Sequence, residues 1–162
     1  MAQERWVLDA ENSQITYQAK HFLHAWSGTN NSVNGLAIKE AGRFTQMAMV
    51  MAVKDFNSGN PSRDANAVEV LEVLSFPNIE FTSSKIIDKE SLVEVSGKIL
   101  FHGIGIEKTI SAALIKPTKN EVQLKGDFEL NLTDFNIKLP SFMLKKMSES
   151  VQVSYLFSFK KQ

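Results

Sequence analysis

The strongest constraint on the fold of this chain is a two-residue alternation of apolar and polar side chains. Residues 93–116, VEVSGKILFHGIGIEKTISAALIK, keep this alternation on both sides of His102 and Gly103. Because successive side chains of a strand point to opposite faces of a sheet, the pattern predicts two strands that share one apolar face. Gly103 and Gly105 favour the bend between them, since glycine accepts a positive φ. The segment is therefore predicted to form a long hairpin.

The same alternation recurs elsewhere and predicts further strands. These strands are expected at residues 5–8, 15–21, 33–40, 46–54, 78–87, 122–132 and 151–159. In the fourth of these segments Met47, Met49 and Met51 occupy one face. Residues 21–32, HFLHAWSGTNNS, are rich in Gly, Asn and Ser, so they are predicted to form a loop.

One amphipathic helix is predicted after residue 62. Its buried stripe stands at i, i+3, i+4 and i+7 and consists of Ala67, Val70, Leu71 and Leu74. Ser62 or Asp64 is expected to cap its start, because a side-chain oxygen can accept from the free N–H groups there. The sequence Ser-Phe-Pro at 75–77 is expected to end it. A second, short helical segment, carrying Phe142 and Met143, is expected near 140–148.

About eight long antiparallel strands with one helix between them favour a closed barrel. An open sheet of this size would leave exposed edges, and closure removes them. An eight-stranded barrel is just wide enough to hold one small or elongated ligand. The predicted fold is all-β: a single domain over residues 1–162, built as an eight-stranded antiparallel lipocalin-like barrel. The helix and the 140–148 segment are expected to cover its ends.

Composition excludes several functions. The chain has 162 residues with 18 basic and 18 acidic side chains, and this balance argues against a nucleic-acid partner. It has no cysteine, so disulfides and thiolate chemistry are excluded. The N-terminal MAQERWVLD lacks the apolar core of a signal peptide. A cytoplasmic location is expected if Met1 is the natural start, and a periplasmic or secreted one if a leader has been removed.

Four segments in order resemble the YceI-like family of polyisoprenoid-binding barrels. They are the strand 15–21 ending in Lys-His, Arg-Asp-Ala at 63–65 followed by a helix and FPNIEF at 76–81, VSGKILFHG at 95–103, and DFNI at 134–137 before the closing strand. Residues 21–29 are similar to a version found in Bacteroidetes-type members, which are usually exported. The chain departs from the family pattern at Asn66, where His is frequent, and at Val70 and Leu71, where two Phe residues are frequent.

The resemblance implies non-catalytic binding, sequestration or transport of a long isoprenoid lipid, either a polyprenyl phosphate or pyrophosphate or an isoprenoid quinone. No cofactor other than this lipid is expected. The protein is expected to be a monomer or homodimer and to contact a membrane transiently. Arg63 and Asp64 either hold a polar head group or serve as a surface arginine and a helix cap. The residues expected to contact the ligand are Tyr17, His21, Trp26, Met49, Met51, Arg63, Asp64, Leu71, Phe81, Ile99, Phe101, Phe128, Leu130, Phe142, Met143, Tyr155 and Phe157.

Three alternatives remain open at this point. The inward side chains could fill a solid core, since eight strands can close on side chains alone. An enzyme could use His21, His24 or His102 at the barrel mouth as metal ligands or general bases. On an extended segment, however, the spacing of His21 and His24 does not bring the two rings together, and His102 is expected to be a hydrogen-bonded residue at a strand end. An interaction module could use exposed strand edges.

Overall fold

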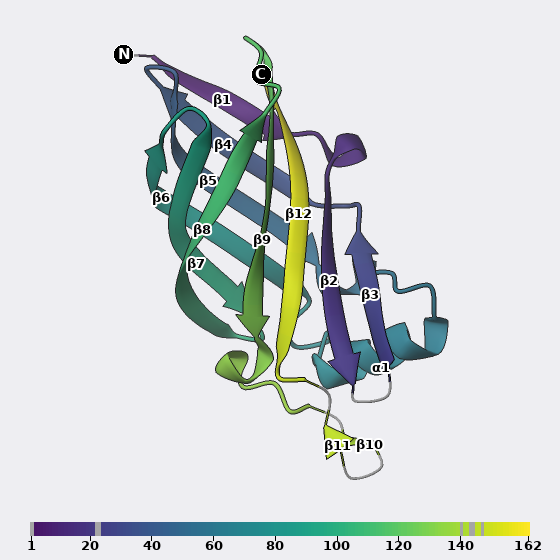
Figure 1. The fold of residues 1–162 in the computed structure, drawn as a ribbon. Helices are drawn as coiled ribbons and strands as arrows, with labels where there is room; N and C mark the ends of the chain where they lie inside the picture. The colour runs from purple at the N-terminus through teal and green to yellow at the C-terminus, as the bar shows by residue number, and fades with distance from the viewer. Residues whose placement is uncertain (1, 22–23, 140, 143–144, 147) are drawn as a thin grey trace.

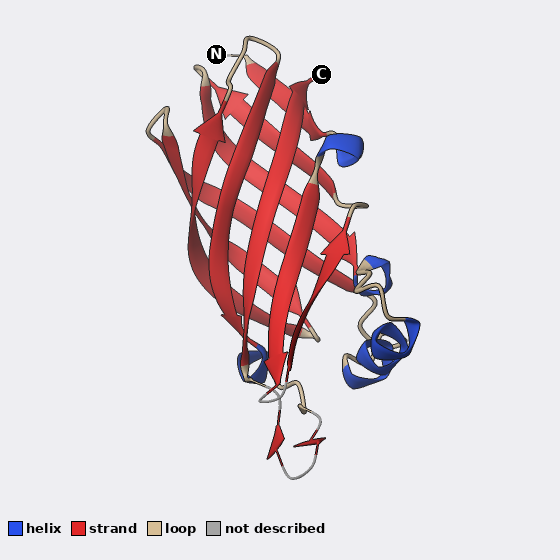
Figure 2. Cartoon of the chain, turned by 45° about the vertical axis from the view of Figure 1, so that its right-hand side comes forward, coloured by secondary structure: helices blue, strands red, loops and turns tan. Residues whose placement is uncertain are grey.

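Eight strands form a closed antiparallel barrel in this protein (Figures 1 and 2). The computed structural model describes residues 2–21, 24–139, 141–142, 145–146 and 148–162. The barrel strands follow the order β1 (Gln3–Leu8), β4 (Asn34–Glu40), β5 (Arg43–Ala52), β6 (Asn78–Asp88), β7 (Leu92–Phe101), β8 (Ile104–Ile115), β9 (Glu121–Asn131) and β12 (Ser150–Lys161). Pairing of β12 with β1 closes the ring. The predicted eight-stranded lipocalin-like barrel is confirmed.

A hairpin attached to β12 extends the barrel wall. It consists of β2 (Gln14–His21) and β3 (His24–Asn30), and the 3-10 turn η1 (Ala10–Asn12) separates it from β1. One edge of β12 is thus shared, because residues 159–161 pair with β1 and residues 152–156 pair with β2. The prediction that residues 21–32 form a loop is wrong, since β3 pairs with β2 along its whole length.

The pairing between β8 and β9 is unusually short. Only three residue pairs join them, from Ala113 opposite Lys125 to Ile115 opposite Gln123. On its other edge β8 forms ten pairs with β7, and β9 forms eleven pairs with β12. Residues 104–112 and 126–131 therefore face each other without ladder pairing. We call this stretch the β8–β9 seam.

The mid-chain helix α1 (Pro61–Val70) is shorter than predicted and is capped by a different residue. The Asn60 side chain accepts from the Arg63 N–H at 3.1 Å, so neither Ser62 nor Asp64 is the cap. Proline is the first helical residue, where its missing N–H costs nothing. The helix ends before Leu74, which is fully exposed and not part of a buried stripe.

The helix ends because Glu72 adopts a left-handed conformation with φ 51°. The Val73 N–H donates to the Val68 carbonyl, and the Glu72 N–H donates to the Glu69 carbonyl. These two hydrogen bonds form a Schellman motif, a helix stop in which glycine is the usual left-handed residue.

The prediction that a short segment near 140–148 is helical is wrong. Strands β10 (Ser141–Phe142) and β11 (Lys145–Lys146) pair as a short antiparallel hairpin below the barrel (Figure 1). Met143 lies outside the described residues, and so does the Phe142 side chain. Two further 3-10 turns, η2 (Val53–Asp55) and η3 (Leu132–Phe135), end β5 and β9. Among the described residues, no helix is long and apolar enough to cross a bilayer.

The barrel end that carries both termini is filled by aromatic side chains. Trp6 and Phe44 meet edge to face with ring centres 6.3 Å apart, and Phe44 and Phe159 lie 6.2 Å apart. All three are at most 2% exposed. We call these three residues the aromatic plug. The Lys39 ammonium lies 4.2 Å from the centre of the Trp6 ring, a favourable cation–π arrangement.

Candidate functional site: the barrel cavity

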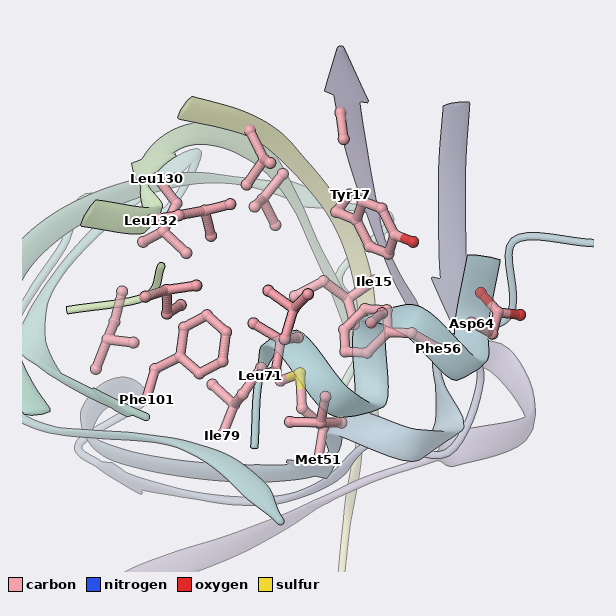
Figure 3. A pocket seen from close by; sticks show the side chains of 18 of the residues that line it. Ile15, Tyr17, Met51, Phe56, Asp64, Leu71, Ile79, Phe101, Leu130 and Leu132 are labelled. Carbon is pink, nitrogen blue, oxygen red and sulfur yellow. The ribbon is translucent and has the colours of Figure 1, made fainter. Parts of the chain in front are cut away.

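Beyond the aromatic plug the barrel is hollow. The hollow contains a cavity with a volume of about 930 Å³, and its lining excludes the plug residues. Figure 3 shows Phe101, Leu130 and Leu132 on one side of the cavity and Tyr17 and Phe56 on the other. The alternative in which inward side chains fill a solid core is therefore excluded.

The structure brings the expected ligand-contacting residues together around this cavity. Those in the lining are Tyr17, His21, Trp26, Met49, Met51, Arg63, Asp64, Leu71, Phe81, Ile99, Phe101, Phe128, Leu130, Tyr155 and Phe157. The Phe142 side chain and Met143 lie outside the described residues, so neither is assigned to the lining. The sequence analysis missed Phe56, Ile137 and Leu139, which also line the cavity. These three lie in irregular segments, where no periodicity marks a side chain as inward.

Strand β5 presents a flexible face to the cavity. Met47, Met49 and Met51 all line it, followed by Val53. An unbranched thioether has several accessible rotamers, so such a face can adapt to an irregular guest.

Two glycines make room for the two tyrosines of the chain. Tyr17 lies opposite Gly28 in the β2–β3 pair, and Tyr155 lies opposite Gly126 in the β9–β12 pair. A Cβ added at either glycine would come within 2.5 Å of the facing phenol ring or its hydroxyl. Each tyrosine ring therefore lies close over the backbone of the glycine on the neighbouring strand, and this position leaves the cavity open.

Most of the polar side chains in the described lining gather at one end of the cavity, which we call the mouth. They come from the tip of the β2–β3 hairpin, from η2 and from α1, and are His21, His24, Lys54, Asn60, Ser62, Arg63, Asp64, Asn66 and Glu69. The mouth thus carries charges of both signs, whereas the rest of the lining is apolar apart from the Trp26 indole and the two phenols. A ligand with a long apolar body and few polar groups fits this distribution.

Contacts at the mouth fix the two charged residues of the Arg-Asp pair. The Arg63 guanidinium carbon lies 5.0 Å from the centre of the Trp26 ring. The Asp64 carboxylate accepts from the Ser58 N–H, with oxygens at 3.1 and 3.3 Å. Asp64 therefore stabilises the loop before α1, and Arg63 covers the Trp26 ring.

The Tyr17 phenol is held in its protonated form. Partial burial is the main cause of its raised pKa, and the nearby Asp64 carboxylate adds to the effect. The Trp26 indole and the Arg63 guanidinium oppose this rise in pKa but do not cancel it.

The three histidines lie in two separate parts of the barrel: His102 is at the β7–β8 turn, and His21 and His24 are at the mouth. His102 is buried, its Nδ1–H donates to the Phe135 carbonyl at 2.9 Å, and its Nε2 lies 2.6 Å from a Glu72 carboxylate oxygen. It is therefore the hydrogen-bonded residue at a strand end that the sequence predicted. The His21 and His24 rings lie at the mouth with centres 5.7 Å apart, so the expectation that their spacing keeps the two rings apart is wrong. The two residues are paired across the β2–β3 hairpin, which the sequence did not predict. Within the part of the chain that the structure describes, no three His, Asp or Glu side chains converge as a metal site.

A closed antiparallel barrel with one apolar cavity and a polar mouth is a lipocalin-like barrel. The chain matches the model of the YceI-like domain over residues 6–159, so it belongs to that family. No curated protein matches the chain.

Solved structures share the fold at low sequence identity. Burkholderia cenocepacia BcnA is similar with a TM-score of 0.82 and 15% identity, over 93% of this chain and 98% of its own. A polyisoprenoid binding domain from Saccharophagus degradans, implicated in plant cell wall breakdown, has a TM-score of 0.79 and 13% identity, over 97% of this chain and 98% of its own. The Campylobacter jejuni YceI protein has a TM-score of 0.72 and 12% identity, over 83% and 84% of the two chains.

Proposed function

We propose that this protein binds a long isoprenoid lipid inside the barrel, without catalysis, to sequester or transport it. The candidate ligands are a polyprenyl phosphate or pyrophosphate and an isoprenoid quinone. The observation that carries the proposal is the 930 Å³ apolar cavity with polar groups at one end. The polyisoprenoid binding domain of similar fold supports the ligand class.

The energetics of such a ligand are favourable. An isoprenoid tail that buries about 600 Å² gains on the order of 15 kcal/mol, at about 25 cal/mol per Å². The loss of translational and conformational freedom offsets a large part of this gain. The apolar tail is therefore expected to supply most of the favourable binding free energy, and the polar groups at the mouth to fix the orientation of the ligand.

The setting of this function is also a proposal. A periplasmic or secreted protein, monomeric or homodimeric, would collect its guest by transient membrane contact at the mouth. The fully exposed Leu74, in the turn after α1, supports a contact surface beside the mouth. Fractionation of the source cells tests the location, and vesicle co-sedimentation with a Leu74→Ser control tests the contact.

Native mass spectrometry followed by organic extraction tests the proposed ligand class. Purified protein is expected to carry a co-purified lipid with isoprenoid mass spacing. A protein that remains empty after incubation with isoprenoid quinones and with polyprenyl phosphates contradicts the proposal.

Two neighbouring alanines of β8 provide a matched test of where the lipid sits. Ala112 is 2% exposed and lines the cavity, whereas Ala113 is exposed on the outer face. Ala112→Trp is expected to abolish lipid retention, and Ala113→Trp is expected to retain it. Circular dichroism of both variants checks that each is folded. Equal retention by two folded variants would place the lipid outside the barrel.

A further inference from the structure

The Tyr155 hydroxyl is a polar group in the apolar part of the cavity, and it has no hydrogen-bond partner among the described residues. Tyr155 is 7% exposed and lines the cavity from β12. The hydroxyl is not among the fully buried polar atoms that lack a partner, so it is accessible from the cavity and available to a molecule that fills it. A guest that excludes water from this site would have to supply the partner itself, because an unpaired donor in an apolar environment is unfavourable.

The surroundings hold this hydroxyl in one place. The Tyr155 ring stacks on Phe157, with ring centres 4.9 Å apart and an interplanar angle of 22°. The hydroxyl lies over Gly126, where an added Cβ would be 2.5 Å from it and 2.9 Å from the Ser111 carbonyl oxygen. The absence of a side chain at position 126 is therefore what allows the hydroxyl to occupy this site.

The site is far from the polar mouth. Tyr155 pairs with Ile15, which lies six residues along β2 from the mouth residue His21, and this corresponds to about 20 Å at a rise of about 3.3 Å per residue. Of the described charged side chains that line the cavity, all lie at the mouth. No lining cation is therefore available beside Tyr155 to neutralise an anionic group.

The protonation state of the phenol makes it a donor. Burial is the main cause of the raised pKa of Tyr155, and the Asp127 carboxylate contributes in the same direction. The same carboxylate would disfavour an anion at this position.

We propose that Tyr155 donates a hydrogen bond to a neutral oxygen of the bound lipid, such as a quinone carbonyl or a ring ether, in the middle of the barrel. This inference rests on the proposed function and narrows it. The guest is an isoprenoid with an uncharged, oxygen-bearing head, and the head enters first. The isoprenoid tail then runs from Tyr155 towards the mouth, along the methionine face of β5.

Paired ligands separate this interaction from simple hydrophobic binding. Decylubiquinone and decylbenzene share the alkyl chain, but only the quinone has carbonyl and methoxy oxygens. Titration calorimetry of the wild type and of Tyr155→Phe is expected to show about a tenfold loss of affinity for the quinone, the effect of one hydrogen bond. The affinity for decylbenzene is expected to remain the same.

The residue before Tyr155 provides the matched control. Ser154→Ala removes a hydroxyl from the exposed outer face of the same strand, outside the cavity lining, so it is expected to leave both affinities unchanged. Farnesyl phosphate tests the charge: Tyr155→Phe is expected to leave its affinity unchanged, because its head would stay at the mouth. Far-ultraviolet circular dichroism and urea unfolding confirm that each variant is folded as stably as the wild type.

The outcomes distinguish the inference from the function beneath it. Equal affinity of Tyr155→Phe and wild type for the quinone, or equal losses for both neutral ligands, overturns the role of Tyr155 and leaves the lipid-binding function intact. A selective loss of farnesyl phosphate affinity overturns the neutral head group. Failure of the wild type to bind any of the three ligands contradicts the proposed function itself.

Discussion

The two tyrosines of the chain are its most informative single residues. Both line the cavity, each lies over a glycine of the neighbouring strand, and both have a raised pKa. Their inward positions follow from the alternation of β2 and β12. The direction of each hydroxyl does not, because it depends on Gly28 and Gly126, which lie far away in the sequence.

The raised pKa values predict how the tyrosines titrate. In the folded protein, absorbance at 295 nm is expected to show less tyrosinate at pH 10, the ordinary midpoint for a tyrosine, than in the unfolded protein. The unfolded protein in urea is expected to titrate near that midpoint. Tyr155→Phe should leave only the Tyr17 signal. Native titration of both residues at the ordinary pH would contradict the burial of the phenols.

The raised pKa values of the tyrosines also affect the stability of the protein at alkaline pH. A group with a raised pKa in the folded state stabilises the fold fully below its unfolded pKa, and this contribution is lost as the pH rises through the folded pKa. The free energy of unfolding is therefore expected to fall above about pH 10, and to fall less steeply in Tyr155→Phe.

At the scale of elements, the contact between the end of α1 and the β7–β8 turn joins two distant segments. His102 and Gly103 have φ values of 54° and 75°, the positive values that a two-residue type I′ turn requires. The His102 ring packs on Phe76, with ring centres 4.7 Å apart, and contacts the carboxylate of Glu72. This contact offsets the cost of a left-handed glutamate at the helix end.

Substitutions at this contact have unequal expected effects. His102→Ala removes both ring contacts and leaves the buried Phe135 carbonyl unpaired, so it is expected to cost about 1–3 kcal/mol in the free energy of unfolding. Glu72→Gly loses the carboxylate but gains the residue that the left-handed position favours, so its expected cost is smaller. Urea unfolding of both variants measures the difference, and a costlier Glu72→Gly would contradict this account.

The β8–β9 seam should be visible in hydrogen exchange. Backbone amides that lack ladder hydrogen bonds open more readily than paired ones. Those amides of residues 104–112 that face β9 are expected to exchange faster than the amides of β7 and β12. Equal protection along both edges of β8 would mean that the seam is paired in solution.

Sequence patterns predicted most of the strands but not the irregular elements. The barrel strands alternate clearly, so their inner faces could be predicted residue by residue. Strand β3 was missed because its Gly28 and Asn30 resemble loop residues. In the structure Gly28 lies under Tyr17, and the buried Asn30 donates to the Ala52 carbonyl. Helix α1 ends early because Glu72 adopts a left-handed conformation and contacts His102. The two residues are far apart in the sequence, so local helix propensity does not predict this contact.

At the scale of the whole molecule, the barrel divides into a packed half and a hollow half. The aromatic plug supplies dense packing at one end, and the cavity occupies the rest. Stability is therefore expected to depend on the plug more than on the residues that line the cavity.

Phe44→Ala tests this division. Phe44 is 1% exposed and contacts both other plug residues, so its removal is expected to cost about 3–5 kcal/mol. Phe56→Ala, at the half-buried mouth position, is expected to cost less than half of that. Urea unfolding followed by circular dichroism gives both values, and similar costs would contradict the division.

A tube stoppered at one end also dictates the order of events when guests are exchanged. An incoming lipid cannot enter behind the bound one, so the bound lipid must dissociate before the next lipid enters. The rate of replacement is then set by departure alone. Stopped-flow displacement should give a rate constant that stays flat as the competitor concentration rises; a rate that climbs with competitor would mean a second way in.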